Sequence, residues 1–314
     1  MTEAEFDIIT IADTCVDLVV DLGDVLPQFG QVEQWVPGYF LEMGGSACIF
    51  ACQAARLGMK VGILGRVGAD DFGELMLNRM RECGVDVRYM QVDPAVKTGL
   101  GVALNRPSGD RAILTYGGSL NAVYPQDLTD EFLLSGRHFH YCSYYLQTNL
   151  LPHIPAIAQR AKALGLTLSL DTNWDPQGSW NGGLATVLSS VDVFFPNGNE
   201  AMAVSGRDSL PAALAELARR VPLVAAKLGE QGCRVVTRDD DLEIPVEVVP
   251  NPVDTIGAGD CFDAGFLAGW LRGLPIAECA AIGNACGRAT TLAPGGVLGQ
   301  LTWESFSRLN PASY

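Results

Sequence analysis

Short apolar runs alternate with longer amphipathic stretches along most of the chain. The runs are rich in Val, Ile, Leu and Phe, which is typical of strands buried on both faces, and the stretches between them carry apolar residues at helical spacing. This alternation predicts an α/β fold, in which helices cover a mostly parallel sheet. The pattern predicts strands over residues 6–12, 61–64, 139–142, 166–170, 191–195 and 223–226, and helices over residues 47–57, 72–83, 154–164, 200–204 and 210–220.

Two segments depart from this alternation. Residues 16–41 contain strand-like pieces that are interrupted by glycine or proline at positions 23, 27, 30 and 37. Residues 99–115 have the pattern of a β-hairpin, with the Pro-Ser-Gly-Asp sequence at 107–110 as its turn. Both segments are therefore expected to lie outside the alternating strands and helices.

Composition and charge narrow the class of protein. The 314 residues are 48% apolar and 18% charged, which is ordinary for a globular enzyme, and we expect one domain over residues 1–314. The net charge of −15 argues against a nucleic-acid or anionic-membrane partner, since both attract cations. The sequence has no run of about eighteen apolar residues and no basic signal peptide at its start, so we expect a cytoplasmic protein.

The strongest chemical signal lies in residues 254–271, where a turn of small residues leads into a helix. Aromatic side chains recur every four positions, at 262, 266 and 270, and give that helix an apolar stripe. The N–H groups of the turn at 257–259 and the positive end of the helix can close around an anion. Asp260 follows the turn and can accept a proton, so the segment favours phosphoryl transfer to an alcohol. The alternative is a glycine-rich loop before a buried helix, with Asp260 only as its cap.

Further motifs accompany this turn in a regular order. Gly-Gly-Ser at 44–46 runs to Ala-Ala-Arg-Leu-Gly at 54–58, and Asp254 and Thr255 precede Gly-Ala-Gly-Asp at 257–260. Between them lie Gly-Arg-Val-Gly at 65–68, Asp-Phe-Gly at 71–73, Asp-Thr-Asn at 171–173, Asn-Gly-Asn-Glu at 197–200 and Lys-Leu-Gly at 227–229. In order and spacing these motifs resemble the ribokinase/PfkB family of carbohydrate kinases over nearly the whole chain.

The resemblance implies a fold and a set of partners. The fold is a ribokinase-like three-layer α/β/α sandwich with a small β-sheet lid, formed here by about residues 16–41 and 97–117. The cofactors are ATP and Mg²⁺, and because such lids often pair with a second subunit, we expect a homodimer. A lid is chemically useful, since water competes with the sugar hydroxyl for the phosphoryl group.

The resemblance also implies the catalytic roles. Asp260 is the expected base, and we expect the helix N-terminus to keep its carboxylate ionised. The amides of Gly257, Ala258 and Gly259 are expected to stabilise charge on the transferred phosphoryl group.

The cation sites follow from the same comparison. Asn197 and Glu200 resemble the N-x-x-E motif of the family, whose Glu helps to order Mg²⁺ and its waters. Because Mg²⁺ keeps several waters, one carboxylate suffices. The alternative is a capping box, with Asn197 as the cap and Glu200 at the third helical position, and the two interpretations are compatible. Asp254 is expected either to help place a monovalent cation such as K⁺, as in some relatives, or to cap the turn.

Four residues are expected on the nucleotide side. Lys227 and Gly229 match the nucleotide-binding stretch of the family, where many members have a hydroxyl residue at the place of Lys227. Its cation suits the ATP phosphates, and the alternative is a solvated surface lysine after a strand. Asn284 lies where family members approach the adenine, and Gly295 falls in the loop after it.

The phosphoryl acceptor is expected near the end of the first strand, where ligands bind in open α/β sheets. Asp17 is the leading candidate and Asp13 the second, because a carboxylate can accept hydrogen bonds from adjacent sugar hydroxyls. Gly44 and Gly45 allow the backbone to approach the sugar closely.

Three further residues bear on the acceptor site. Ser46 is expected in the acceptor site, and a serine at this position weakens an assignment as ribokinase or phosphofructokinase. Asp171 is expected to support the floor of the site. Ile49 departs from the family, which usually has Asn there, so a polar contact is missing.

The resulting prediction is an ATP-dependent kinase that phosphorylates a hydroxyl of a small sugar, such as a fructose-like hexose or a sugar acid. A nucleoside kinase of the same family is the nearest alternative. A dinucleotide-dependent oxidoreductase lacks support, because no G-x-G-x-x-G follows the first strand. A non-catalytic sugar-binding protein is the third hypothesis, and the glycine turn with Asp260 argues against it.

Overall fold

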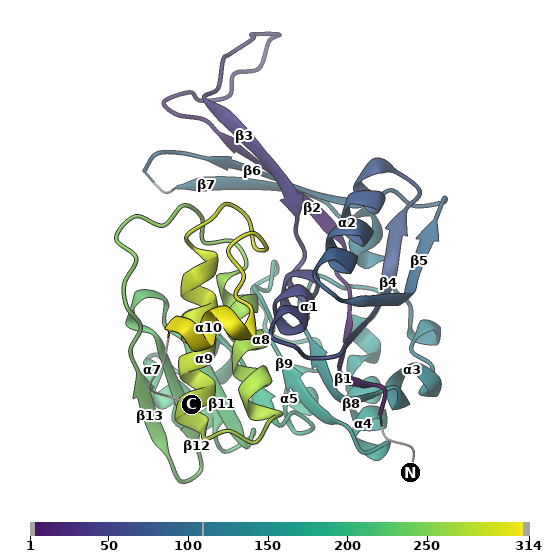
Figure 1. Cartoon of the computed structure of the whole chain (residues 1–314), viewed down its shortest axis with the longest axis vertical. Coiled ribbons are helices and arrows are strands. Elements are labelled where there is room, and N and C mark those ends of the chain that lie inside the picture. Colours follow the sequence, from purple (N-terminus) through teal and green to yellow (C-terminus); the bar gives the residue numbers. More distant parts are fainter. Residues whose placement is uncertain (1–3, 109, 310–314) are drawn as a thin grey trace.

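The larger of two sheets forms the centre of the molecule. Figure 1 shows the computed structural model, which describes residues 4–108 and 110–309. The strands of the larger sheet are β1 (Phe6–Ile11), β4 (Val61–Gly68), β5 (Asp86–Asp93), β8 (Gly136–Tyr141), β9 (Thr167–Leu170), β10 (Val193–Phe194), β11 (Leu223–Lys227), β12 (Cys233–Thr237) and β13 (Asp241–Ile244). Their order is β13-β12-β11-β10-β9-β8-β1-β4-β5, and all pair in parallel except β12 and β13.

Helices cover both faces of this sheet, and each face has its own buried cluster of apolar side chains. One face carries α1 (Ser46–Arg56), α2 (Asp71–Glu82), α8 (Ala258–Trp270), α9 (Ile276–Thr290) and α10 (Trp303–Leu309). The other carries α3 (Asp130–Leu134), α4 (Ile154–Ala163), α5 (Leu184–Leu188), α6 (Gly198–Ser205) and α7 (Leu210–Leu217). Short 3₁₀ turns are η1 (Gly118–Asn121), η2 (Pro125–Asp127), η3 (Leu151–His153) and η4 (Gly229–Gln231). Within the described residues, no helix combines the length and apolar character that a membrane crossing requires.

The predicted α/β architecture is confirmed. Each strand predicted from an apolar run lies in the larger sheet, and the five predicted helices correspond to α1, α2, α4, α6 and α7. The pattern did not predict β5 and β13, which are the two edge strands of the sheet, or β12, which lies next to β13. Edge strands are exposed on part of their surface, so their sequences are less continuously apolar.

The second sheet is formed by the two segments that departed from the alternation. Its strands are β2 (Cys15–Asp21), β3 (Gly38–Met43), β6 (Gly99–Asn105) and β7 (Arg111–Tyr116), in the order β3-β2-β6-β7. Figure 1 shows this sheet at one end of the molecule, with the connection between β2 and β3 extending beyond it. β6 and β7 pair antiparallel as the predicted hairpin requires, whereas Gly109 of the predicted turn lies outside the described residues.

The carboxyl ends of the central strands meet at one edge of the larger sheet. Asp13 follows β1, Asp171 follows β9, Asn197 follows β10, and Lys227 is the last residue of β11. The loops that lead into α1 and α8 approach the same edge, as contacts between Asp13, Ser46 and Asp260 show. This arrangement brings four carboxyl ends and two helix N-termini together.

Candidate active site

The N-terminus of α8 forms the centre of the site. Gly257 is its N-terminal cap and has a φ of 73°, a left-handed conformation that favours glycine. A Cβ atom at Gly257 would lie 2.7 Å from the Cα of Gly296 and 2.9 Å from the Cγ2 of Ile49. Position 257 therefore has room for glycine alone. The apolar side chain of Ile49 packs against it, so no polar contact is made from position 49 here.

Asp260 stands in the first turn of α8 and is buried, with 7% of its surface exposed. Burial raises its pKa to about 7, the Asp171 charge adds to this rise, and the Lys227 charge and the Ser46 hydroxyl oppose it. This corrects the expectation that the helix N-terminus keeps Asp260 fully ionised, because burial outweighs the helix end. A pKa near neutrality suits a group that takes up a proton during each turnover.

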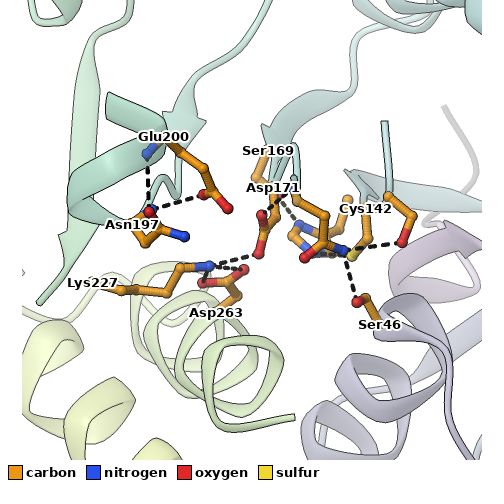
Figure 2. Close-up of polar contacts among 11 residues, drawn as sticks. Ser46, Cys142, Ser169, Asp171, Asn197, Glu200, Lys227 and Asp263 are labelled. Atoms are coloured by element: carbon orange, nitrogen blue, oxygen red, sulfur yellow. Dashed lines mark hydrogen bonds and ion pairs between the residues drawn. The ribbon is translucent and has the colours of Figure 1, made fainter. Parts of the chain in front are cut away.

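Lys227 lies in a buried cluster with two carboxylates, as Figure 2 shows. Its Nζ atom is 2.6 Å from Oδ2 of Asp171 and 3.2 Å from Oδ1 of Asp263. Burial by itself lowers the pKa of Lys227. The charges of Asp171, Asp263 and Glu200 raise this pKa by more than burial lowers it, so the lysine stays charged. With 14% of its side chain exposed, it is not the solvated surface lysine of the alternative interpretation.

Asp263 is the residue of this cluster that the sequence did not predict. Its side chain is fully buried. A signal was present, since Asp263 lies three residues after Asp260 and therefore on the same side of a helix. A charged residue among the apolar residues of a predicted buried stripe needs a partner.

Asn197 and Glu200 form a capping box at the start of α6. The Asn197 N–H donates to Oε2 of Glu200 at 2.8 Å, and the Glu200 N–H donates to Oδ1 of Asn197 at 2.9 Å (Figure 2). The Asn197 side chain also hydrogen-bonds to the Glu200 carboxylate. Burial and the Asp171 charge raise the pKa of Glu200 to about 7. A buried carboxylate at this edge of the sheet fits a cation held through water.

A pocket opens beside the first turn of α8. It is bounded by Lys227 and Gly229 at the end of β11, by the loop after β13, and by α9. Asn284 lines this pocket, but its side-chain N–H₂ group donates to the carbonyl oxygens of Ile244 at 2.9 Å and Pro245 at 3.3 Å. Asn284 therefore holds the loop that forms one wall.

Gly295 and Asp254 are joined by a hydrogen bond near the turn that precedes α8. Gly295 has a φ of 70°, and a Cβ atom there would lie 2.8 Å from the Phe40 ring in β3. Its N–H donates to Oδ2 of Asp254 at 3.0 Å, while Oδ1 accepts from the N–H groups of Thr255 and Ile256. The Asp254 carboxylate thus caps the loop before α8, as one of its two expected roles requires.

Asp13 caps α1. Its carboxylate accepts from the N–H groups of Ser46 at 2.9 Å and Ala47 at 3.0 Å, and from the Ser143 hydroxyl at 2.5 Å. A Cβ atom at Gly45, which has a φ of 80°, would collide with the Asp13 backbone. Burial raises the pKa of Asp13 to about 6, although all these hydrogen bonds lower it. With its oxygens occupied by the protein, Asp13 is the weaker of the two acceptor-binding candidates.

Asp17 has the opposite character. It lies on β2, half-buried, and its carboxylate packs against Gly44 and Gly101, where any Cβ atom would collide with it. Among the described residues, the carboxylate has only a long contact of 4.0 Å with the Cys15 thiol. Burial raises the pKa of Asp17 to about 7, with smaller contributions from Asp13 and Asp254. Its oxygens are available to a ligand.

Ser46 interacts both with the loop after β9 and with the first turn of α8. Its hydroxyl accepts from Nδ2 of Asn173 at 2.8 Å and also interacts with Asp260. Asn173 follows Asp171 after β9 and has a φ of 52°. The predicted site residues Asp13, Ser46, Asp171, Lys227 and Asp260 thus interact with one another at one edge of the sheet.

Comparison with known proteins identifies the family. A model described as pfkB family carbohydrate kinase matches residues 7–303. The chain belongs to this family. It is 32% identical over 247 residues to the ATP-dependent ribose-1-phosphate kinase of Halopiger xanaduensis, covering 79% of each chain. It is also 32% identical over 269 residues to the fructokinase of Klebsiella pneumoniae, covering 80% of this chain and 86% of the relative.

A solved structure supports the fold assignment. The ribokinase of Arabidopsis thaliana, complexed with ribose and ATP, has a TM-score of 0.84 at 22% identity, and the match covers 98% of this chain and 99% of the ribokinase. The ribokinase-like fold predicted from the motifs is confirmed. The chain is accordingly a sugar or nucleoside kinase of the pfkB family, with ATP as the phosphoryl donor.

Proposed function

We propose that this kinase transfers the γ-phosphoryl group of ATP to a hydroxyl of a small sugar, a fructose-like hexose or a sugar acid, with Asp260 as the base. The observation that carries the proposal is the buried Asp260 carboxyl in the first turn of α8, the same turn whose residues Ala258 and Gly259 line the pocket. Phosphoryl transfer has a loose transition state, so the protein mainly positions the reactants and stabilises charge.

On the nucleotide side, the amides of Gly257, Ala258 and Gly259 face the transferred group and stabilise its charge. Lys227 adds a positive charge next to Gly259. Bound Mg²⁺ would neutralise charge on the phosphates, and Glu200 is the residue that would hold it. We also propose that Asp254 helps to place a K⁺ ion. Asp260 accepts the proton of the attacking hydroxyl.

On the acceptor side, Asp17 orients the sugar by accepting hydrogen bonds from its hydroxyls. Gly44 keeps the approach to that carboxylate open. Tyr144 and Tyr145 offer no open aromatic surface to the base of a nucleoside, since both are buried and their hydroxyls donate to the backbone carbonyls of Gly182 and Asn181.

We also propose that the second sheet acts as a lid and pairs with the same sheet of a second subunit in the cytoplasm. Every residue of β7 is exposed, and large apolar side chains are exposed on this sheet and its connecting loop. They are Phe29, Trp35, Tyr39, Ile113, Leu114 and Tyr116. Apolar surface of this kind is typical of an interface. Light scattering is expected to give twice the chain mass, and a monomer would contradict the pairing.

The experiment that tests the proposed function is a coupled ADP-release screen with ATP and Mg²⁺. The acceptors are neutral sugars, sugar acids, sugar phosphates and nucleosides at matched concentrations. We expect the highest kcat/KM with a neutral hexose or a sugar acid. A clear preference for nucleosides would replace the proposed acceptor class, and ADP release without any acceptor dependence would contradict the proposal.

A further inference from the structure

Asp263 is buried on α8 in a position that requires a partner. It lies one helical turn after Asp260, and none of its side chain is exposed. A buried carboxylate is costly unless it is paired. The Nζ atom of Lys227 lies 3.2 Å from its Oδ1 and 3.3 Å from its Oδ2, so the ammonium group is one partner, and a side-chain hydrogen bond with Asp171 is another.

Asp171 holds the same ammonium group from a second direction. The distance from Nζ to Oδ2 of Asp171 is 2.6 Å, and only 3% of the Asp171 side chain is exposed (Figure 2). Asp171 follows β9, Lys227 ends β11 and Asp263 belongs to α8, so the pair of carboxylates ties two strand ends to the helix. A lysine side chain is otherwise mobile, and two ion pairs fix its charge in one place.

The fixed charge lies at the anion-binding turn. A Cβ atom at Gly259 would lie 3.5 Å from Nζ of Lys227, and both residues line the pocket beside α8. The ammonium group therefore stands next to the backbone amides that face the transferred phosphoryl group. Charged hydrogen bonds to phosphate are about twice as strong as neutral ones, so this position affects affinity and rate.

The same charge acts on Asp260. The titratable and polar groups that face Asp260 come from each element packed around it. They are Asp13 after β1, Ser46 and Cys48 in α1, Cys142 after β8, Asp171 after β9, Lys227 in β11 and Asp263 in α8. Lys227 is the cation of this set, and its charge opposes the rise in the pKa of Asp260.

We propose that Asp171 and Asp263 are positioning residues that clamp the Lys227 ammonium group at the N-terminus of α8, where it acts on the transferred phosphoryl group and on Asp260. This inference rests on the proposed function of the site. It gives a role to Asp263, and it explains how this chain uses a lysine where many relatives have a hydroxyl residue.

The test is a double-mutant cycle with Lys227→Met and Asp263→Ala, and with Asp263→Asn as the conservative variant. The first readout is the affinity for the non-hydrolysable analogue AMP-PNP with Mg²⁺, measured by calorimetry. Each single variant is expected to bind AMP-PNP about tenfold more weakly. The double variant is expected to bind no more weakly than Lys227→Met, because Asp263 acts through Lys227. Asp263→Asn keeps an acceptor oxygen and should retain most of the affinity.

The second readout is the pH dependence of kcat/KM with the acceptor that the screen identifies. Removing the Lys227 charge should move the acid limb of Lys227→Met to higher pH, an effect that a merely structural lysine would not have. The matched control is the pair Lys162 and Asp192, 2.9 Å apart, changed to Met and Ala. It is expected to leave both readouts unchanged, because Asp192 precedes β10 and so lies at the opposite end of the strands.

Additive losses in the double variant, or wild-type affinity in Asp263→Ala, would overturn the clamp. Because breaking a buried ion pair is destabilising, a melting curve is recorded for each variant. If Asp263→Ala does not fold, Asp263→Asn and the double variant carry the test, since the double variant leaves no lysine charge unpaired. A chain that binds AMP-PNP with this coupling but phosphorylates no acceptor would contradict the proposed function and leave the clamp intact. Sugar phosphorylation together with additive losses of affinity would support the proposed function and overturn the clamp.

Discussion

The two sides of the site are built in different ways. On the nucleotide side, Gly257, Asp260 and Lys227 are held by α8 and the larger sheet, and each functional group has fixed partners within the protein. On the acceptor side, Asp17 lies on the smaller sheet, half-buried, with its oxygens nearly free of protein donors. Under the proposed function, the groups that act on the phosphoryl group are thus held by the packed helices and the larger sheet, whereas the proposed acceptor-binding carboxylate belongs to the smaller sheet.

The largest effect is expected from Asp260→Asn. Loss of the base should lower kcat by about 10³-fold, while the affinity for AMP-PNP changes little because the amides of α8 remain. Steady-state kinetics and calorimetry measure the two quantities. A variant with kcat within tenfold of wild type would show that Asp260 is not the base. The nucleotide side would then lack the group on which its proposed role depends.

A smaller and more selective effect is expected from Asp17→Ala. Loss of a charged hydrogen-bond acceptor should raise KM for the sugar by about 10–100-fold, since such bonds contribute about 1.5–3 kcal/mol. KM for ATP should remain unchanged. If KM for ATP rises as much as KM for the sugar, the two sides are not separate, and if neither rises, the acceptor binds elsewhere.

Glu200→Gln tests the proposed Mg²⁺-holding role of Glu200 on the nucleotide side. The amide can still cap α6 but carries no charge, so we expect the Mg²⁺ concentration for half-maximal rate to rise by about tenfold. The melting temperature should change little, because the capping box survives. An unchanged Mg²⁺ requirement would leave Glu200 with the capping role alone.

The smallest effect concerns stability. The pKa of Asp260 is raised from 3.8 to about 7, so between these pH values the folded protein binds more protons than the unfolded chain. Stability is therefore lost as pH rises from about 4 to 7, and Asp260→Asn should recover roughly 1–3 kcal/mol of unfolding free energy at pH 8. Urea unfolding at pH 5 and pH 8 measures this difference. A destabilised variant at pH 8 would mean that the buried charge is better compensated than the structure indicates.

The fold and the start of α8 could be predicted from the sequence because their signals are local. Apolar runs indicated the buried strands, and a glycine turn before an apolar stripe indicated the start of α8. The edge strands β5 and β13, and β12 next to β13, lacked that signal. Asp263 and the capping role of Asp13 could not be predicted with confidence from spacing, because their partners Lys227, Ser46 and Ser143 are distant in sequence.

The balance of charge at Asp260 was also beyond sequence reasoning. The helix N-terminus is a local feature and favours the ionised carboxylate, whereas burial and the charge of Asp171 arise only when the sheet and helices pack together. Long-range packing therefore decided the sign of the shift in pKa.

The most direct test of the account is the pH dependence of kcat/KM from pH 5 to 9, measured in parallel on the wild type, Asp17→Asn and Glu200→Gln. Because Asp260 must be ionised to accept the hydroxyl proton, we expect kcat/KM to fall below about pH 7, where the pKa of Asp260 lies. This acid limb should persist in both variants. A flat profile, or a limb that disappears in either variant, would contradict the assignment of Asp260 as the base.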